Sequence, residues 1–389
     1  MGALLALAAS PAAAEPPLAL LQNGQGLAGI SRQSNDVAVS PDGRHVYAAT
    51  NDWAITFRRE ADGRLAFVAE TTLLPWFGRR VAVTPDGAHV LVLVDTAGAA
   101  AVVVYARDTT TGALTFVEIE AEQLGGSASS LAVTGDGERV YVASPDQGAI
   151  VAYARNPASG LLAFAQRVGE GDPGVAGLLT PGHLAVSPDD RHLYATSFVE
   201  QGEEFAPAIA RLRREDDGSL SFVGADETGL QDPSAEAGPA DLLVAPDGGE
   251  LLVLDGGIPN GPGAAARRFA RDPEHGTLAY VGSEPLTEPG VFEGELDWFA
   301  LRPDGRRLFA GGYNFGDAIC GAPVCVPVVT WTRDGAGALA PLGRVESSGG
   351  IGAHGVVSPD GRYVYATPAQ GVRVLVPEAR GASAALAAL

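Results

Sequence analysis

The stretch VAVSPDGRHVYAAT at residues 37–50 recurs six more times along the chain. Each copy places two short apolar runs around a turn, in most copies Pro-Asp-Gly, in which proline presets one φ angle and glycine supplies a positive one. This pattern predicts a β-hairpin at every copy. The other six copies are VAVTPDGAHVLVLV (81–94), LAVTGDGERVYVAS (131–144), LAVSPDDRHLYATS (184–197), LLVAPDGGELLVLD (242–255), FALRPDGRRLFAGG (299–312) and GVVSPDGRYVYATP (355–368).

A second hairpin follows the first after a stretch of variable length. Examples are ITFRREADGRLAFV (55–68) and VVVYARDTTTGALTFV (102–117), again with glycine at the turn. Two hairpins give the four strands of a propeller blade, so seven copies predict an all-β, seven-bladed β-propeller with four antiparallel strands per blade. The seventh copy has three strands, and PLALLQNGQGLAG (17–29) resembles the missing fourth. We therefore expect the N-terminal strand to complete the last blade and so remove an exposed sheet edge.

The composition narrows the chemistry that the chain can perform. All 26 basic residues are arginine, which excludes a Walker phosphate loop and a Schiff-base lysine. The net charge of −21 argues against binding to nucleic acid or to anionic membranes. Two cysteines are too few for an iron–sulfur cluster or a thiolate-rich zinc site. We expect no cofactor and no bound metal.

The first residues predict export. MGALLALAASPAAA (1–14) joins an apolar run to small residues, as signal peptides do, although no basic residue precedes Arg32. No later apolar run is long enough to span a membrane, so we expect a periplasmic or secreted protein. In such an oxidising compartment we expect a disulfide between Cys320 and Cys325. The expected organisation is a signal peptide at 1–14, the propeller at 15–378 and a flexible C-terminal tail at 379–389.

The repeats differ in length, and the extra residues fall between the second and third strands or between blades. Strand alternation places both of these connections on one face of the disk, which we call the long-loop face. One such loop is expected at residues 198–207. Variable loops on a rigid scaffold commonly carry binding sites, so the long-loop face is the candidate functional face.

The innermost strand of each blade should begin on the long-loop face. The residue six positions before each turn aspartate is therefore expected to line the mouth of the central channel. Around this mouth ring His183 neighbours Asp241, and His354 neighbours Asp36. A His–Asp pair can act as a general base, and an arginine can bind a carboxylate or stabilise an oxyanion. The seven positions are Asp36, Arg80, Ser130, His183, Asp241, Trp298 and His354.

With its SPDGRxxY turns and DxxTGxL hairpins, the chain resembles the seven-bladed lactonase-like propellers. That family includes bacterial 6-phosphogluconolactonase-type proteins and fungal carboxymuconate lactonising enzymes. The resemblance covers roughly residues 15–378 and implies that a small lactone is hydrolysed or formed at the channel mouth. Through GHLAVSPDDRHLY (182–194) it also implies that His183 belongs to the site. The sequence departs from the family in one respect, since its mouth ring contains no glutamate.

Two hypotheses from different classes follow. A lactonase-like enzyme would act on a small-molecule lactone, whereas a non-catalytic exported propeller would bind a protein or glycan through the long-loop face. Under both hypotheses we expect a monomer that neither binds nucleic acid nor inserts into membranes. For the enzyme, the expected catalytic residues are His183, Asp241, His354, Asp36 and Arg80, and the expected substrate-binding residues are Trp298, Asp297, Arg79 and Ser130.

Overall fold

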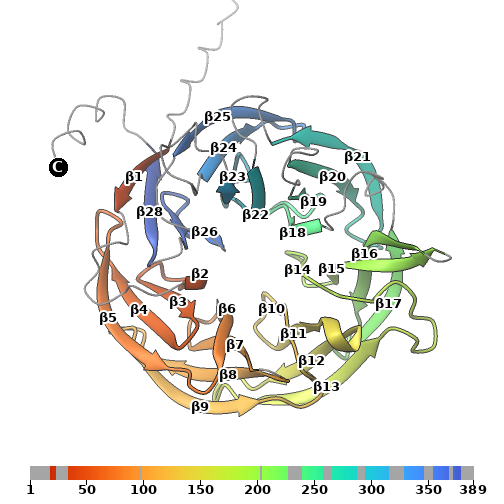
Figure 1. The fold of residues 1–389 in the computed structure, drawn as a ribbon, viewed down its shortest axis with the longest axis horizontal. Helices are drawn as coiled ribbons and strands as arrows, with labels where there is room; N and C mark the ends of the chain where they lie inside the picture. The colour runs from red at the N-terminus through yellow and green to blue at the C-terminus, as the bar shows by residue number, and fades with distance from the viewer. Residues whose placement is uncertain are drawn as a thin grey trace, which may run out of the picture.

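The computed structural model describes residues 18–22, 34–96, 98–201, 204–226, 239–256, 264–286, 294–314, 328–345, 354–367 and 371–377. Within these ranges, seven four-stranded antiparallel sheets are arranged in a ring (Figure 1). Apart from the short 3-10 helix η1 (Pro145–Gln147), the regular elements of the described part are all strands. The predicted seven-bladed propeller is confirmed.

Each blade runs from an inner strand beside the central axis to an outer strand at the rim. Blade 1 contains β2 (Ser34–Val39), β3 (His45–Thr50), β4 (Trp53–Arg59) and β5 (Leu65–Thr72). Blade 2 contains β6 (Phe77–Val83), β7 (His89–Thr96), β8 (Ala99–Arg107) and β9 (Leu114–Glu120). Blade 3 contains β10 (Ser130–Val133), β11 (Arg139–Ser144), β12 (Ala149–Arg155) and β13 (Leu162–Gly169).

The remaining blades follow the same order. Blade 4 contains β14 (Leu184–Val186), β15 (His192–Gln201), β16 (Glu204–Arg214) and β17 (Leu220–Asp226). Blade 5 contains β18 (Pro239–Val244), β19 (Glu250–Asp255), β20 (Ala265–Arg271) and β21 (Leu278–Pro285). Blade 6 contains β22 (Gly294–Leu301), β23 (Arg307–Asn314), β24 (Val328–Arg333) and β25 (Leu339–Val345). Blade 7 contains β26 (Gly355–Val357), β27 (Val364–Ala366), β28 (Arg373–Pro377) and β1 (Leu18–Gln22).

Blade 7 is completed by the N-terminal strand, as the sequence predicts. β1 pairs antiparallel with β28, with Leu18 opposite Pro377 and Leu20 opposite Leu375. The sheet order is β1-β28-β27-β26, so the first and last strands of the described chain share one sheet (Figure 1). This pairing covers the edge of β28 that would otherwise be exposed.

The hydrophobic core lies between neighbouring sheets. In β7 the run HVLVLV is buried on both faces, as expected for a strand between two packed layers. Val90 and Val92 pack with residues of blade 1, whereas Leu91 and Leu93 pack with residues of blade 3. Alternation along a single strand thus joins three blades.

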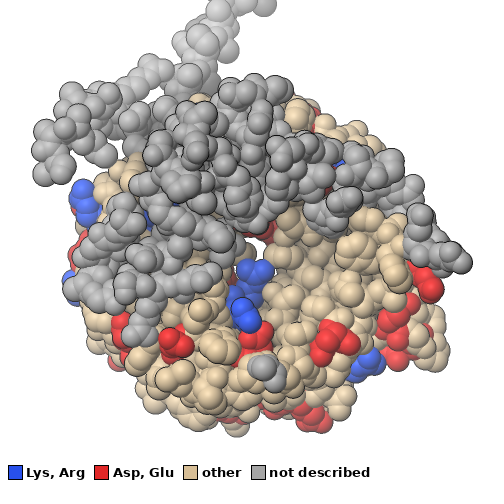
Figure 2. All heavy atoms as spheres, in the orientation of Figure 1, with Lys and Arg blue, Asp and Glu red and all other residues tan. Residues whose placement is uncertain are grey.

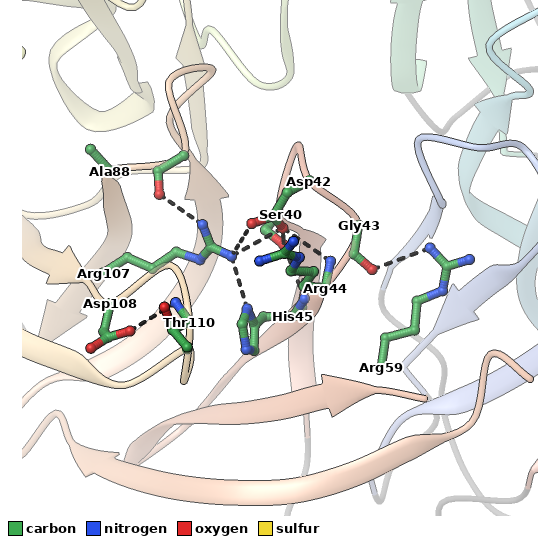
Figure 3. Close-up of polar contacts among 12 residues, drawn as sticks. Ser40, Asp42, Gly43, Arg44, His45, Arg59, Ala88, Arg107, Asp108 and Thr110 are labelled. Carbon is green, nitrogen blue, oxygen red and sulfur yellow. Dashed lines mark hydrogen bonds and ion pairs between the residues drawn. The ribbon is translucent and has the colours of Figure 1, made fainter. Parts of the chain in front are cut away.

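A second inter-blade contact lies on the face opposite the channel mouth, at the Pro-Asp-Gly turns (Figure 3). Arg107, which ends β8 of blade 2, binds Asp42 in the turn of blade 1 and also contacts His45 Nδ1 at 2.8 Å. We call this arrangement the turn clasp. The arginine that ends a third strand binds the turn aspartate of the preceding blade in the pairs Arg155–Asp86, Arg214–Asp136, Arg271–Asp189 and Arg59–Asp360.

One predicted loop is a hairpin instead. Across residues 198–207, β15 and β16 remain paired, with Phe198 opposite Pro207 and Val199 opposite Ala206. Val199 and Ala206 are buried in a small apolar cluster, which explains why the ladder continues through this segment.

Several sequence predictions concern residues outside the described ranges. These are the signal peptide at 1–14, the tail at 379–389 and the Cys320–Cys325 disulfide. Among the residues that the structure describes, no helix is long and apolar enough to cross a membrane.

Candidate functional site

The seven mouth-ring residues lie within the inner strands or directly before them, beside the central axis (Figure 1). Figure 2 shows a hollow at the centre of this face, with arginine atoms at its rim. In blades 1, 2, 5 and 6 the strand has a register shift just before the mouth residue, as between Ser34 and Asp36. Such a bulge redirects the strand end, a feature common near binding sites.

His183 and Asp241 form the first ion pair of the ring. His183 Nδ1 in blade 4 lies 3.2 Å from Asp241 Oδ1 in blade 5. The same carboxylate accepts hydrogen bonds from Leu242 N at 2.9 Å and from Phe299 N, in blade 6, at 3.2 Å. These contacts fix the carboxylate between two inner strands and aim it at the imidazole.

His354 and Asp36 repeat this construction at the junction of blades 7 and 1. His354 Nδ1 lies 2.8 Å from Asp36 Oδ1. The carboxylate accepts hydrogen bonds from Val37 N and from Val81 N of blade 2, both at 2.8 Å. In each pair the aspartate belongs to the blade after the histidine and bonds to the inner strand of the blade after that. The imidazoles remain accessible, with 22% of the His183 side chain and 25% of the His354 side chain exposed.

Arg80 and Ser130 also bridge neighbouring blades. Arg80 Nε donates to Ser129 O of blade 3 at 3.1 Å. Ser130 Oγ accepts a hydrogen bond from Leu184 N of blade 4 at 3.1 Å. Ser130 is buried, whereas Arg80 is partly exposed, so Arg80 is the one able to meet a ligand at the mouth.

The pKa values reflect a single electrostatic cluster. Burial raises the pKa of Asp36, but His354, Arg80 and the Val81 amide together lower it by more. The pKa of Asp36 therefore lies below 3.8. Burial also raises the pKa of Asp241, but His183, His354 and the Phe299 amide together lower it by more, so it too lies below 3.8. Burial lowers the pKa of His183 below 6.5, against the opposing influence of Asp241. His183 is therefore neutral near pH 7 and can accept a proton.

The expected substrate-binding residues differ in their access to solvent. Trp298 is only 1% exposed and packs with Phe309 and Val364 between blades 6 and 7. Arg79 is exposed, and its Nε binds both carboxylate oxygens of Asp95 at 2.8 Å. Asp297 is a partly buried bulge residue of β22. Of the four, the structure gives only Arg79 broad access to solvent.

Sequence reasoning missed the role of the backbone at the mouth. The carboxylates of Asp36 and Asp241 are held by amides of the next blade, so each has a structural bond in addition to its histidine. Within the described residues, no group of three or more His, Cys, Asp or Glu side chains is arranged to hold a metal ion.

Comparison with known proteins agrees with this architecture. The family model described as lactonase, seven-bladed β-propeller, matches residues 18–127, which span β1 and the first two blades. No curated protein sequence matches the chain. The fold is that of a seven-bladed β-propeller, and over residues 18–127 the chain is similar to the lactonase family.

Solved structures extend the similarity to most of the chain. A periplasmic gluconolactonase from Pseudomonas aeruginosa is 19% identical, with a TM-score of 0.63 over 89% of each chain. A proposed 6-phosphogluconolactonase from Bacteroides uniformis is 18% identical, with a TM-score of 0.59 over 81% of this chain and 88% of that one. Hydrazine synthase from Kuenenia stuttgartiensis is 17% identical, with a TM-score of 0.64 over 92% of this chain and 99% of that one. At these identities the likeness concerns the fold, which serves unrelated activities.

Proposed function

We propose that the protein hydrolyses a small lactone at the mouth of its central channel. The observation that carries the proposal is the repeated construction of the two ion pairs, His183–Asp241 and His354–Asp36. Both stand in one ring with Arg80, and both imidazoles reach solvent. A buried carboxylate that orients an accessible neutral imidazole is the arrangement of a general base.

His183 is the base that the electrostatics favour. Its lowered pKa keeps the imidazole neutral near pH 7, and the Asp241 carboxylate accepts a hydrogen bond from Nδ1–H, which leaves the Nε2 lone pair free. Nε2 then removes a proton from water as the water oxygen bonds to the lactone carbonyl carbon. When the ring C–O bond breaks, the departing alkoxide takes that proton back from the imidazolium.

Arg80 is placed to stabilise the negative charge on the carbonyl oxygen. Its guanidinium is anchored through Nε to Ser129 O, so it is oriented before a substrate binds. A fixed cation aimed at a developing oxyanion contributes more than a mobile one, because it need not reorganise during the reaction.

The family match and the lactonase names of two neighbours support lactone chemistry, and the periplasmic neighbour supports an exported location. Export would favour an unphosphorylated lactone as the substrate. Together with the apolar N-terminal residues, this leads us to propose a periplasmic or secreted hydrolase.

The test is hydrolysis of a panel of sugar and aromatic lactones by the purified protein. We expect His183→Gln to lower kcat by about 10²-fold or more, the usual contribution of a general base. His354→Gln shows whether the second pair takes part. The matched control is His275→Gln, which changes a 65% exposed histidine in the β20–β21 turn and should leave activity unchanged. A wild-type protein inert on the whole panel would exclude the proposal.

A binding role is the second candidate, and one observation favours it. Leu74, in the connection that leads into β6, is 62% exposed, and Phe77, the first residue of β6, is 42% exposed. Exposed apolar side chains on one face of the disk suit contact with a glycan or a protein. If no lactone is hydrolysed, Phe77→Ser tests this role by its effect on binding to a glycan array.

A further inference from the structure

Two threonines mark the blades that carry the mouth histidines. The thirteenth residue of the repeat is Thr196 in blade 4 and Thr367 in blade 7. Only these two blades have histidine at the mouth position. At the thirteenth position the other five blades carry Ala49, Leu93, Ala143, Leu254 and Gly311.

In blade 4 the threonine hydroxyl binds the backbone of the histidine. His183 N donates to Thr196 Oγ1 at 2.9 Å, while Thr196 N donates to His183 O at 3.0 Å. The Thr196 carbonyl accepts Gly182 N at 2.8 Å. Two successive amides therefore donate to Thr196. Gly182 N donates to its carbonyl oxygen, and His183 N donates to its hydroxyl oxygen.

Blade 7 repeats the arrangement. His354 N donates to Thr367 Oγ1 at 2.9 Å, and Thr367 N donates to His354 O at 2.9 Å. Thr367 Oγ1 also donates to His354 O at 3.0 Å. The same local structure therefore occurs at both histidines.

These hydroxyls replace part of the strand ladder. In blades 1 and 5 the ladder includes the mouth residue, with Asp36 opposite Ala49 and Asp241 opposite Leu254. In blades 4 and 7 the inner strand begins one residue later, at Leu184 and Gly355. The histidine backbone thus lies outside the regular strand, where the threonine hydroxyl holds it.

The threonines that accept hydrogen bonds from the His183 and His354 amides are buried. Thr196 is 3% exposed and Thr367 is fully buried. A Cβ atom on Gly182 would lie 2.6 Å from Thr196 Oγ1, so a side chain there would force the hydroxyl or the backbone to shift. Removing the hydroxyl would leave a buried N–H without an acceptor or force the histidine backbone to move.

We propose that Thr196 and Thr367 are positioning residues, each holding one mouth histidine against the aspartate of the next blade. The inference rests on the proposed function only in assigning a catalytic use to the two His–Asp pairs. The contacts themselves predict that each threonine controls the geometry of its own pair, His183–Asp241 or His354–Asp36, and not that of the other.

The test reads the imidazoles directly and does not require activity. With ¹⁵N-labelled histidine, the six histidines of the chain give few enough NMR signals to assign by substitution. In the wild type, we expect both mouth histidines to carry the proton on Nδ1, because the carboxylate fixes the tautomer. We expect Thr196→Val, which keeps the shape and removes the hydroxyl, to abolish this preference at His183 and to leave His354 unchanged.

Thr367→Val should give the reverse result, with the change at His354 alone. Thr196→Ser keeps the hydroxyl and should retain the wild-type tautomer. The matched control is Thr50→Val in blade 1, because Thr50 is also fully buried and its Oγ1 accepts Trp53 N at 3.0 Å. It should cost similar stability and leave His183 unchanged.

The outcomes separate this inference from the proposed function. If Thr196→Val keeps the Nδ1 proton on His183, or alters both histidines equally, the positioning role is wrong. Should Thr196→Val not fold, Thr196→Ala answers the same question with a smaller side chain. If the wild type hydrolyses a lactone, Thr196→Val should lower kcat about tenfold with little change in KM, and Thr196→Ser should restore it. An inert wild type would overturn the proposed function and leave the tautomer result standing.

Discussion

Arg107 Nη2 in blade 2 lies 2.9 Å from Asp42 Oδ2 in the Pro-Asp-Gly turn of blade 1. The arginine side chain is 1% exposed, and its Nε donates to Tyr47 Oη at 2.9 Å. The repeated aspartate therefore does more than shape a turn, since it also binds the next blade (Figure 3). Contacts between sheets hold a propeller together, so the turn clasp contributes to the stability of the ring.

Arg107→Met should lower the free energy of unfolding by about 3 kcal/mol, because removal of one partner leaves a partly buried charge without its ion pair. Denaturant-induced unfolding measures the loss. The control is Arg58→Met, since Arg58 is 60% exposed and its pair with Glu60 should contribute less than about 0.5 kcal/mol. Equal losses in the two variants would show that the turn clasp contributes nothing beyond a surface ion pair.

Gly112→Ala should destabilise the protein by about 2–5 kcal/mol. Gly112, in the β8–β9 turn of blade 2, has a φ of +78°, and a Cβ there would lie 2.3 Å from His45 Cδ2 in blade 1. Both the positive φ and the collision with a packed neighbour are unfavourable. Gly171→Ala separates the two, because Gly171 has a φ of +80° with nothing within 4 Å of its Cβ position. If Gly112→Ala lowers the free energy of unfolding no more than Gly171→Ala does, the His45 imidazole moves aside without a measurable cost.

Stability should decrease as the pH falls below about 6.5. Burial and a neighbouring arginine lower the pKa of His45, His89 and His192 below their ordinary value of 6.5. Below pH 6.5 the unfolded chain therefore binds more protons than the folded chain, and the free energy of unfolding falls. Above pH 6.5 this contribution is constant. Asp42 does not interfere, because its pKa is lowered to about 2 and its contribution is lost only below pH 3.8.

Thermal unfolding between pH 8 and pH 5 measures this dependence. We expect His89→Gln to show a shallower decline than the wild type, since one of the groups that resist protonation is gone. Stability that rises toward pH 5, or a slope unchanged in His89→Gln, would contradict the assignment of a lowered pKa to this histidine.

The blades were predictable because their information is local. Each hairpin is specified by its turn residues and by a few alternating apolar residues on either side. Counting back from the turn places His183 beside Asp241, and the two are in contact in the structure. In the turn clasp Arg107 binds Asp42, 65 positions away, yet the repeated arginine at the end of the third strand was a usable signal.

Side-chain direction at the mouth was not predictable by counting. Trp298 occupies a mouth position in the sequence, but its indole turns into the junction of blades 6 and 7. Gly311 and Gly355 leave room for it, since a Cβ at either position would lie within 2.6 Å of the ring. Gly311 lies opposite Trp298 on the neighbouring strand of blade 6, and Gly355 lies across the junction in blade 7, so the two are recognisable as its neighbours only after the strands are placed.

Deletion of residues 1–22 should destabilise the whole ring, by about 3 kcal/mol or more, because β1 covers the edge of β28 and its Leu21 packs with blades 7 and 1. Gln22 adds a second link, since its Nε2 donates to Leu65 O at 3.1 Å and its Oε1 accepts Leu65 N at 2.8 Å, across to the outer strand of blade 1. Deletion of residues 1–17 keeps β1 and is the matched control, with an unchanged melting temperature expected. If the two deletions melt at the same temperature, the N-terminal strand does not close the ring in solution, and blade 7 is stable with three strands.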